Sequence, residues 1–304
     1  MMRPAVDSYC WHRQFGDWYP EIQQDPGVRV SVWDVIARAR AMGFAGISLE
    51  ACYMPPLDAP TLARLGAALG EAGLEPVWAW GHPSGLSSGA DPAAAKDLIA
   101  HIANARAVGA KAMRICCGGR RTRPASWPEH KARLLPLLRE IVGPAGEAGV
   151  VLAIENHIDL LADELVELIE AVNSPWLGVC LDTVNNLRLL EDPMAVAAKL
   201  APYTRATHLK DCVAWRGSPR DFSFWPSVPL GQGIIDIPGV IGLLAKQGYA
   251  GLLAIEIDFL HPEWGPKSGR ESGPESGPES GDEEAAIAES LRYLKALLSR
   301  SGES

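Results

Sequence analysis

The hydrophobic positions of this chain fall into short apolar runs that are separated by longer amphipathic segments. Each run is rich in Val, Ile, Leu or Trp and ends in polar or charged residues. Near-continuous apolar runs of this length are typical of parallel strands that helices cover. The runs predict eight strands: Val6–Cys10, Gly46–Glu50, Leu74–Trp80, Ala110–Cys117, Val150–His157, Leu177–Asp182, Arg205–Asp211 and Leu252–Asp258.

The segments between the runs carry the start and stop signals of helices. Ser31 and Asp91 stand at N-cap positions, and glycines follow several segments where helices end. The clearest predicted helices are Val32–Met42, Pro92–Val108, Trp127–Ala148 and Ala162–Val172. Because strands and helices alternate eight times and no GxGxxG follows the first run, we predict an α/β protein, a single (β/α)₈ TIM barrel over residues 1–304.

One segment does not fit a barrel. Residues 268–281 repeat the units ESGP and ESG and offer no side chain that can bury apolar surface. This composition predicts a low-complexity flexible loop at about 264–282, ahead of a last helix at Glu283–Leu298.

Composition and net charge limit the kinds of molecule that this protein is expected to bind. With 304 residues, of which 47% are hydrophobic, the chain can bury a large core. A net charge of −9 argues against binding to nucleic acid or to an anionic membrane. The one dense basic run, Arg120, Arg121 and Arg123, is interpreted as a solvated loop.

The sequence also favours a cytoplasmic protein. No apolar stretch approaches the roughly 18 residues that cross a membrane, and the first residues lack the pattern of a signal peptide. The six cysteines show no CxxC spacing, so we expect reduced thiols rather than disulfides.

Polar residues at the strand ends carry the candidate chemistry. Alternate residues of a barrel strand face inward, and all strands open with their C-terminal ends on one face. Four successive predicted strands place a small residue and then a charged one or a histidine on the same side. These pairs are Ala153 and Glu155, Cys180 and Asp182, Ala206 and His208, and Ala254 and Glu256.

We therefore expect Glu155, Asp182, His208 and Glu256 to converge at the mouth of the barrel. Three carboxylates and an imidazole repel one another and desolvate badly unless a cation lies between them. The mixed oxygen and nitrogen set suits one divalent ion, Mn²⁺ or Mg²⁺ first and Co²⁺ or Zn²⁺ as alternatives. The competing interpretation is a set of independent salt bridges to Lys210, Arg114 or His157.

These residues lie in motifs that resemble the xylose-isomerase-like TIM barrels, the sugar phosphate isomerases and epimerases. The motifs are AIENH (153–157), VCLDTVNNL (179–187), THLKD (207–211), PLGQGIID (229–236) and LLAIEID (252–258). The resemblance covers the chain except for residues 264–282. It implies a metal held by Glu155, Asp182, His208 and Glu256, with the two glutamates flanking the substrate as acid and base groups.

One position departs from this family pattern. Members similar to the ketohexose 3-epimerases carry a histidine three residues after the aspartate of strand six, where this chain has Asn185. The departure argues against a standard ketose 3-epimerase. It also removes a ligand that the multi-metal site of endonuclease IV-type barrels needs.

Five further residues are candidates for substrate binding. Asn185 and His82 lie at the predicted active face, and Arg114 faces inward on strand four, where an unpaired guanidinium would be costly. His157 contacts substrate, orients Glu155 or makes a structural hydrogen bond. Lys210 stabilises a developing oxyanion or forms a salt bridge to Glu256 or Asp258.

The sequence thus predicts a divalent-metal-dependent isomerase or epimerase of a keto-sugar or sugar phosphate. Glu155 and Glu256 would move a proton next to a carbonyl through a metal-bound enediolate. A lyase or dehydratase that uses the same site is the alternative, and an endonuclease IV-like phosphodiesterase or a non-catalytic sugar-binding barrel is more remote. The expected partner is a small carbohydrate, and a homo-oligomer stays open.

Overall fold

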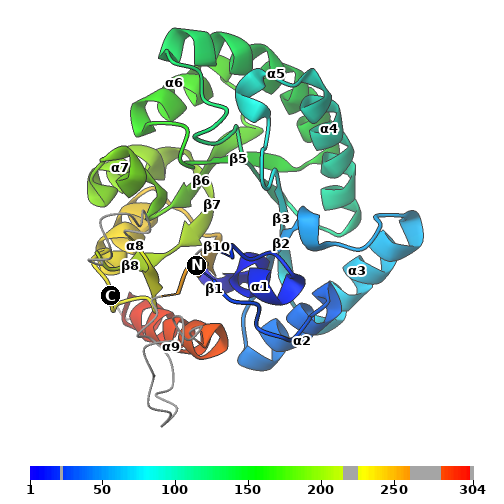
Figure 1. Ribbon diagram of the computed structural model, residues 1–304, viewed down its shortest axis with the longest axis vertical. Coiled ribbons are helices and arrows are strands. Elements are labelled where there is room, and N and C mark those ends of the chain that lie inside the picture. The colour runs from blue at the N-terminus through cyan, green and yellow to red at the C-terminus, as the bar shows by residue number, and fades with distance from the viewer. Residues whose placement is uncertain (21–22, 215–224, 261–281, 302–304) are drawn as a thin grey trace.

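The computed structural model describes residues 1–20, 23–214, 225–260 and 282–301. Eight parallel strands close into a barrel in the order β1-β10-β7-β6-β5-β4-β3-β2 (Figure 1). The strands are β1 Arg3–Asp7, β2 Gly46–Glu50, β3 Glu75–Trp80, β4 Ala112–Ile115, β5 Val151–Glu155, β6 Leu177–Asp182, β7 Thr204–Leu209 and β10 Leu252–Ile255. The predicted (β/α)₈ barrel is confirmed.

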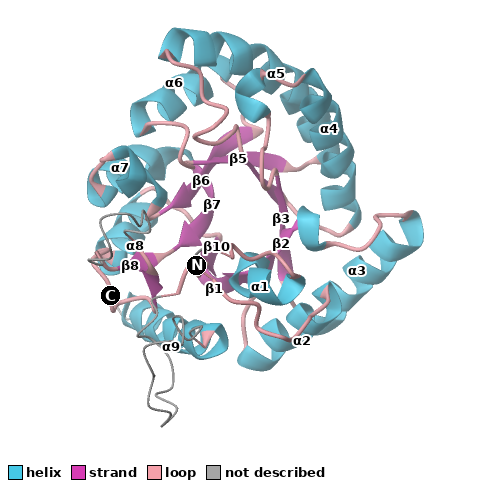
Figure 2. Ribbon diagram, in the orientation of Figure 1, coloured by secondary structure: helices cyan, strands magenta, loops and turns pink. Residues whose placement is uncertain are grey.

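Helices surround this barrel on the outside (Figure 2). The outer helices are α2 Val32–Met42, α3 Ala59–Ala72, α4 Pro92–Ala107, α5 Trp127–Ala148, α6 Ala162–Val172, α7 Pro193–Leu200, α8 Ile237–Lys246 and α9 Glu283–Ser301, and the short helix α1 His12–Phe15 follows β1. Beyond β7, a small antiparallel pair joins β8 Asp211–Cys212 to β9 Ser227–Val228. No helix of the described part is long and apolar enough to cross a membrane.

Helix ends follow the local signals of the sequence. At α2, the Ser31 hydroxyl accepts the backbone N–H of Asp34, and the Asp34 carboxylate accepts the N–H of Ser31. Gly43 ends this helix at φ +78°, a conformation that glycine adopts without strain. These capping interactions are local in sequence, which explains why the predicted bounds of α2 are confirmed, and the predicted bounds of α5 and α6 are confirmed as well.

The first strand is the clearest correction. We predicted Val6–Cys10, but β1 is Arg3–Asp7. The Asp7 carboxylate accepts the backbone N–H of Tyr9 at 2.6 Å and turns the chain into a 3₁₀ helix at Ser8–Trp11. Hydropathy does not register this turn, because Cys10 and Trp11 after it are buried as well.

Several other predicted strands are too long because the residues that follow each strand are buried as well. The runs Ala110–Cys117, Val150–His157, Arg205–Asp211 and Leu252–Asp258 extend past their strands into buried loops. The predicted loop at 264–282 and its repeat at 268–281 lie outside the described residues. All six cysteines are free, as predicted.

Small side chains line the inside of the barrel. Ala153, Cys180 and Ala206 pack together in one inner cluster, and Ala5 and Ala254 belong to another. The bulkier residues that alternate with them pack outward against the helices. A cavity of about 180 Å³ lies at the N-terminal end of the barrel, and His208 is among the residues that line it. The narrow inner side chains leave room for long polar side chains at the other end.

Gly46 provides a test of how tightly the barrel packs. A Cβ atom at this position would overlap the Leu252 side chain and lie 2.7 Å from the backbone oxygen of Glu75. We expect Gly46→Ala to lower the free energy of unfolding by about 1–3 kcal/mol, measured by denaturant unfolding. The matched control is Gly70→Ala in α3, where a Cβ meets nothing within 4 Å, and a gain of about 0.5–1 kcal/mol is expected. Equal effects at both positions would contradict this account.

Candidate metal centre

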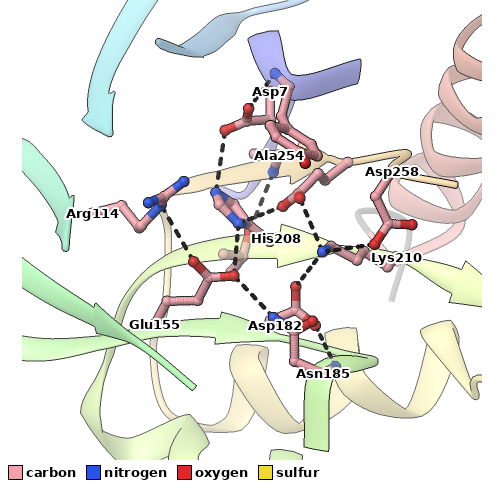
Figure 3. A network of polar contacts seen from close by, with 12 residues as sticks. Asp7, Arg114, Glu155, Asp182, Asn185, His208, Lys210, Ala254 and Asp258 are labelled. Carbon is pink, nitrogen blue, oxygen red and sulfur yellow. Dashed lines mark hydrogen bonds and ion pairs between the residues drawn. The ribbon is translucent and has the colours of Figure 1, made fainter. Parts of the chain in front are cut away.

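The four predicted ligand residues meet at the C-terminal mouth of the barrel. Glu155 ends β5, Asp182 ends β6, His208 lies in β7 and Glu256 directly follows β10. One ligand atom from each lies within 4.8 Å of the others, and all four side chains are buried. Figure 3 shows Glu155, Asp182 and His208 pointing toward one another from separate strands. The expected convergence is therefore observed.

Several polar atoms of this cluster make no hydrogen bond of ordinary geometry. Among the described residues, Asp182 Oδ2, His208 Nδ1 and Glu256 Oε2 are buried without a hydrogen bond. His208 Nδ1 lies 2.6 Å from Glu256 Oε2 and 3.4 Å from Glu155 Oε1. Carboxylate oxygens and an imidazole nitrogen are good ligands for a divalent ion, and buried atoms of this kind are costly unless something binds them. The residues present fit a metal ion.

Lys210 partly neutralises the cluster. Its Nζ lies 2.9 Å from Glu256 Oε1, 3.2 Å from Asp182 Oδ2 and 3.5 Å from Asp258 Oδ2. Burial lowers the pKa of this amine, but the carboxylates outweigh burial and hold its pKa well above the ordinary value. Lys210 is therefore charged, and the salt bridges to Lys210 that the competing interpretation named do form.

The carboxylates respond to Lys210 differently. Burial raises the pKa of Asp182 to about 6, although Lys210 opposes this rise. For Glu256, the attraction of Lys210 and His208 exceeds the effect of burial and lowers the pKa to about 2. The positive charge of Lys210 therefore does not offset the effect of burial on the pKa of every carboxylate that it contacts.

Glu155 is held by a separate set of contacts. Asn185 Nδ2 donates to Glu155 Oε1 at 3.0 Å, and Arg114 Nε lies 3.4 Å from Oε2. Burial raises the pKa of Glu155, yet Arg114 and His208 together keep it well below the usual range. Arg114 also forms an ion pair with Glu50 at the end of β2. Two of the predicted substrate-binding residues therefore contact a predicted ligand directly.

The two candidate histidines outside the cluster have other partners. His157 Nδ1 lies 3.2 Å from the backbone oxygen of Gly118, which corresponds to the structural hydrogen bond among the predicted roles. His82 Nε2 lies 3.1 Å from Asp17 Oδ2, and its ring meets Tyr9 edge-on at 5.4 Å between centroids. It borders a cavity of about 440 Å³ beside the start of α4 rather than the ligand cluster.

Aromatic side chains gather above the ends of β1 and β2. Tyr9 stacks on His12 at 4.6 Å, and Phe15 stacks on Tyr53 at 4.5 Å between ring centroids. The Tyr53 hydroxyl donates to Asp17 at 2.8 Å. These rings above β1 and β2 are thus held largely by mutual stacking.

Sequence reasoning missed Asp7. This residue ends β1, is fully buried, and places Oδ2 3.2 Å from His208 Nε2 (Figure 3). Ala5 and Asp7 repeat the pattern of a small and then a charged residue that identified the four ligands. The signal was hidden because the predicted strand began at Val6, which placed Asp7 near its start instead of at its C-terminal end.

Comparisons with known proteins agree with this geometry. A family model described as xylose isomerase-like TIM barrel matches residues 36–297. The rhizopine catabolism protein MocC of Rhizobium meliloti is 28% identical over 149 residues, which cover 45% of this chain and 45% of that protein. The chain therefore aligns with less than half the length of this curated relative.

Solved structures resemble the whole chain. A xylose isomerase domain protein from Planctomyces limnophilus has a TM-score of 0.73 at 20% identity, with 100% of this chain and 99% of that one covered. An L-ribulose 3-epimerase has a TM-score of 0.71 at 21% identity, with 100% and 96% covered. At these identities the similarity shows the fold.

Asp159, in the loop after β5, is buried and has no hydrogen bond to either carboxylate oxygen among the described residues. Burial raises its pKa to about 7, against an unfolded value of about 3.9. The folded state then binds more protons between about pH 4 and pH 7, so the contribution of Asp159 to stability falls as the pH rises through this range.

We expect Asp159→Asn to have a higher free energy of unfolding than the parent protein above pH 7, by up to roughly 4 kcal/mol. The difference should vanish near pH 4. Denaturant titrations across this range measure it. Asp163→Asn, at an exposed position of α6, is the control. A difference that does not change with pH would refute the buried, protonated Asp159.

Proposed function

The chain belongs to the xylose isomerase-like TIM barrel family, and on this premise we propose that it is a divalent-metal-dependent isomerase or epimerase of a keto-sugar or sugar phosphate. The observation that carries the proposal is the cluster of four ligand atoms within 4.8 Å at the C-terminal mouth of the barrel. This is the face on which TIM barrels carry their active sites.

Glu155, Asp182, His208 and Glu256 would hold the ion, with Mn²⁺ or Mg²⁺ preferred and Co²⁺ or Zn²⁺ compatible. When bound, a divalent ion at this site polarises a carbonyl and makes the neighbouring C–H more acidic. Three of the four ligands are carboxylates, which favours such hard ions over soft ones.

The two glutamates would move the proton. Glu155 comes from β5 and Glu256 from the end of β10, and β6 and β7 separate these strands in the barrel. A substrate between them therefore meets one carboxylate on each side, so that one glutamate removes the proton and the other returns it. Return to the opposite face of the same carbon gives an epimer, and return to the neighbouring carbon gives an aldose or ketose isomer.

The residues around the glutamates would support this transfer. Arg114 and Asn185 fix Glu155 through its two oxygens, which holds the carboxylate in one orientation. Lys210, charged and buried beside Glu256, is placed to donate to a substrate oxygen on which negative charge develops. His157, whose Nδ1 is held by the Gly118 carbonyl, would present its other nitrogen to the substrate. His82 would contact only the outer part of a larger substrate, because its own partner is Asp17.

A carbohydrate substrate is also supported by the similar proteins. One solved relative is an L-ribulose 3-epimerase and the curated relative acts in rhizopine catabolism. Asn185 stands where the ketohexose 3-epimerases carry histidine, so we propose a substrate other than the usual ketohexoses. Elimination begins with the same proton removal, which keeps a lyase or dehydratase as the alternative outcome.

Glutamine substitutions test the two proton-transfer groups. With saturating Mn²⁺ and keto-sugars in D₂O, we expect Glu155→Gln and Glu256→Gln each to slow deuterium incorporation by about 10²–10⁴-fold, followed by NMR. Glu75→Gln is the matched control, because Glu75 begins β3 at the other end of the barrel and pairs with Arg3. Exchange at the parental rate in either site variant would exclude that glutamate, and the mass of the product separates isomerisation from elimination.

Metal removal provides a second test. Mn²⁺ at about 100 times its dissociation constant should stabilise the fold by roughly 2.7 kcal/mol relative to protein with chelator, because the ion binds the folded state. We expect Asp182→Asn to lose most of this increment while unfolding normally without metal. Calorimetric melting curves with and without Mn²⁺ measure both, and an identical increment in the variant would remove Asp182 from the ligand set.

A further inference from the structure

We propose that Asp7 is a positioning residue of the metal centre, which acts through His208 and keeps the imidazole Nδ1 directed at the other three ligands. The inference rests on the metal site proposed above. It concerns a residue from a strand that contributes no ligand, and the experiments below separate its failure from the failure of the site itself.

The barrel register brings Asp7 to the far side of His208. Ala5 pairs with Ala254, and Ala254 pairs with His208, so β10 alone separates β1 from β7. Asp7 is two residues beyond Ala5 on the same face of β1. Its Oδ2 lies 3.2 Å from His208 Nε2, while His208 Nδ1 lies 2.6 Å from Glu256 Oε2 on the opposite side of the ring. Figure 3 shows the Asp7 carboxylate beside the His208 imidazole.

Neither end of this contact has another partner. Among the described residues, Asp7 Oδ2 and His208 Nε2 are both buried without a hydrogen bond, so each is the polar group available to the other. The second oxygen of Asp7 is fixed by the Tyr9 backbone N–H at 2.6 Å. The adjoining Ser8 hydroxyl accepts the backbone N–H of Glu50 at 2.8 Å and ties this turn to β2. The Asp7 carboxylate is therefore anchored with Oδ2 facing His208.

This arrangement selects one form of the imidazole. A neutral histidine has one N–H and one lone pair, and an ionised carboxylate only accepts hydrogen bonds. Asp7 therefore favours the proton on Nε2, which leaves the lone pair on Nδ1, the nitrogen that faces the carboxylates of Glu155 and Glu256. A carboxylate behind a metal-ligating histidine fixes its orientation and raises its basicity, and losing such a partner typically costs about 10–100-fold in metal affinity.

Two substitutions give different expectations. Asp7→Ala removes the acceptor but leaves Nε2 free to keep its proton. Asp7→Asn keeps the shape of the side chain; its single oxygen accepts from the Tyr9 N–H, so its NH₂ group faces His208 Nε2 and donates to it. That donation moves the imidazole proton to Nδ1 and blocks the ligand position. We therefore expect Asp7→Asn to weaken Mn²⁺ binding more than Asp7→Ala, although it is the smaller change in volume.

The experiment measures Mn²⁺ dissociation constants on the full chain by the EPR signal of free Mn²⁺. We expect an increase of about 10–100-fold for Asp7→Asn and a smaller increase for Asp7→Ala. The control is Glu283→Gln, which removes another buried carboxylate from its pair with Arg13 and should leave Mn²⁺ affinity within twofold of the parent value. Asp7→Asn within twofold of the parent value, or equal losses in the control, would overturn the proposal.

A measurement on the unmodified chain keeps the inference testable if a variant does not fold. Long-range ¹⁵N–¹H correlation spectra of the Mg²⁺-loaded protein, with His208 assigned through His208→Gln, report which ring nitrogen carries the proton. We expect the proton on Nε2 of His208, and a proton on Nδ1 alone would refute the role of Asp7. If the parent protein binds no Mn²⁺, the metal site itself fails; if it binds and only the Asp7 expectations fail, the site stands without this residue.

Discussion

Buried negative charge at the mouth of the barrel is the constraint on which the rest of the structure depends. Six carboxylates are buried there, those of Asp7, Glu50, Glu155, Asp182, Glu256 and Asp258, together with the cations Arg114 and Lys210. If all six are ionised and His208 is protonated, an excess of three negative charges remains before the half-buried Arg188, 3.9 Å from Asp258, is included. Burying uncompensated charge is costly, and three atoms without hydrogen bonds, Asp182 Oδ2, His208 Nδ1 and Glu256 Oε2, belong to the side chains that meet in the cluster. A divalent cation at that point both lowers this cost and supplies the chemistry that we propose.

The barrel meets this constraint through the size of its inner side chains. The inner side chains next to the cluster, Ala153, Cys180, Ala206 and Ala254, are small, so long acids, Arg114 and Lys210 can extend across the mouth without steric conflict. The bulky alternating residues pack against the helices and provide the hydrophobic stabilisation that offsets the polar end. The polar cluster and the hydrophobic packing against the helices thus use opposite faces of the same strands.

The polar contacts also make the two glutamates unequal. Glu155 is fixed by Asn185 and Arg114, whereas Glu256 contacts Lys210 and His208. A pair of carboxylates in different surroundings can take different roles in proton transfer, because each surrounding stabilises charge to a different degree. Asn185, the departure from the ketohexose 3-epimerase pattern, is therefore itself part of the centre, as a donor to Glu155.

The sequence by itself determined the order of strands and helices, several helix ends and the four residues that converge. These follow from the period of two along each strand, the repeat of about one βα unit, and caps such as the one at Ser31, all of which are local. Only the tertiary structure decided where β1 ends, that Asp7 lies behind His208, that Arg114 joins Glu50 to Glu155, and that His82 turns to Asp17. These contacts join residues up to about two hundred positions apart, and a strand pattern specifies which side a residue faces but not which side chain it meets there. The contact between Asp7 and His208 in particular forms only when β1 closes the barrel against β10.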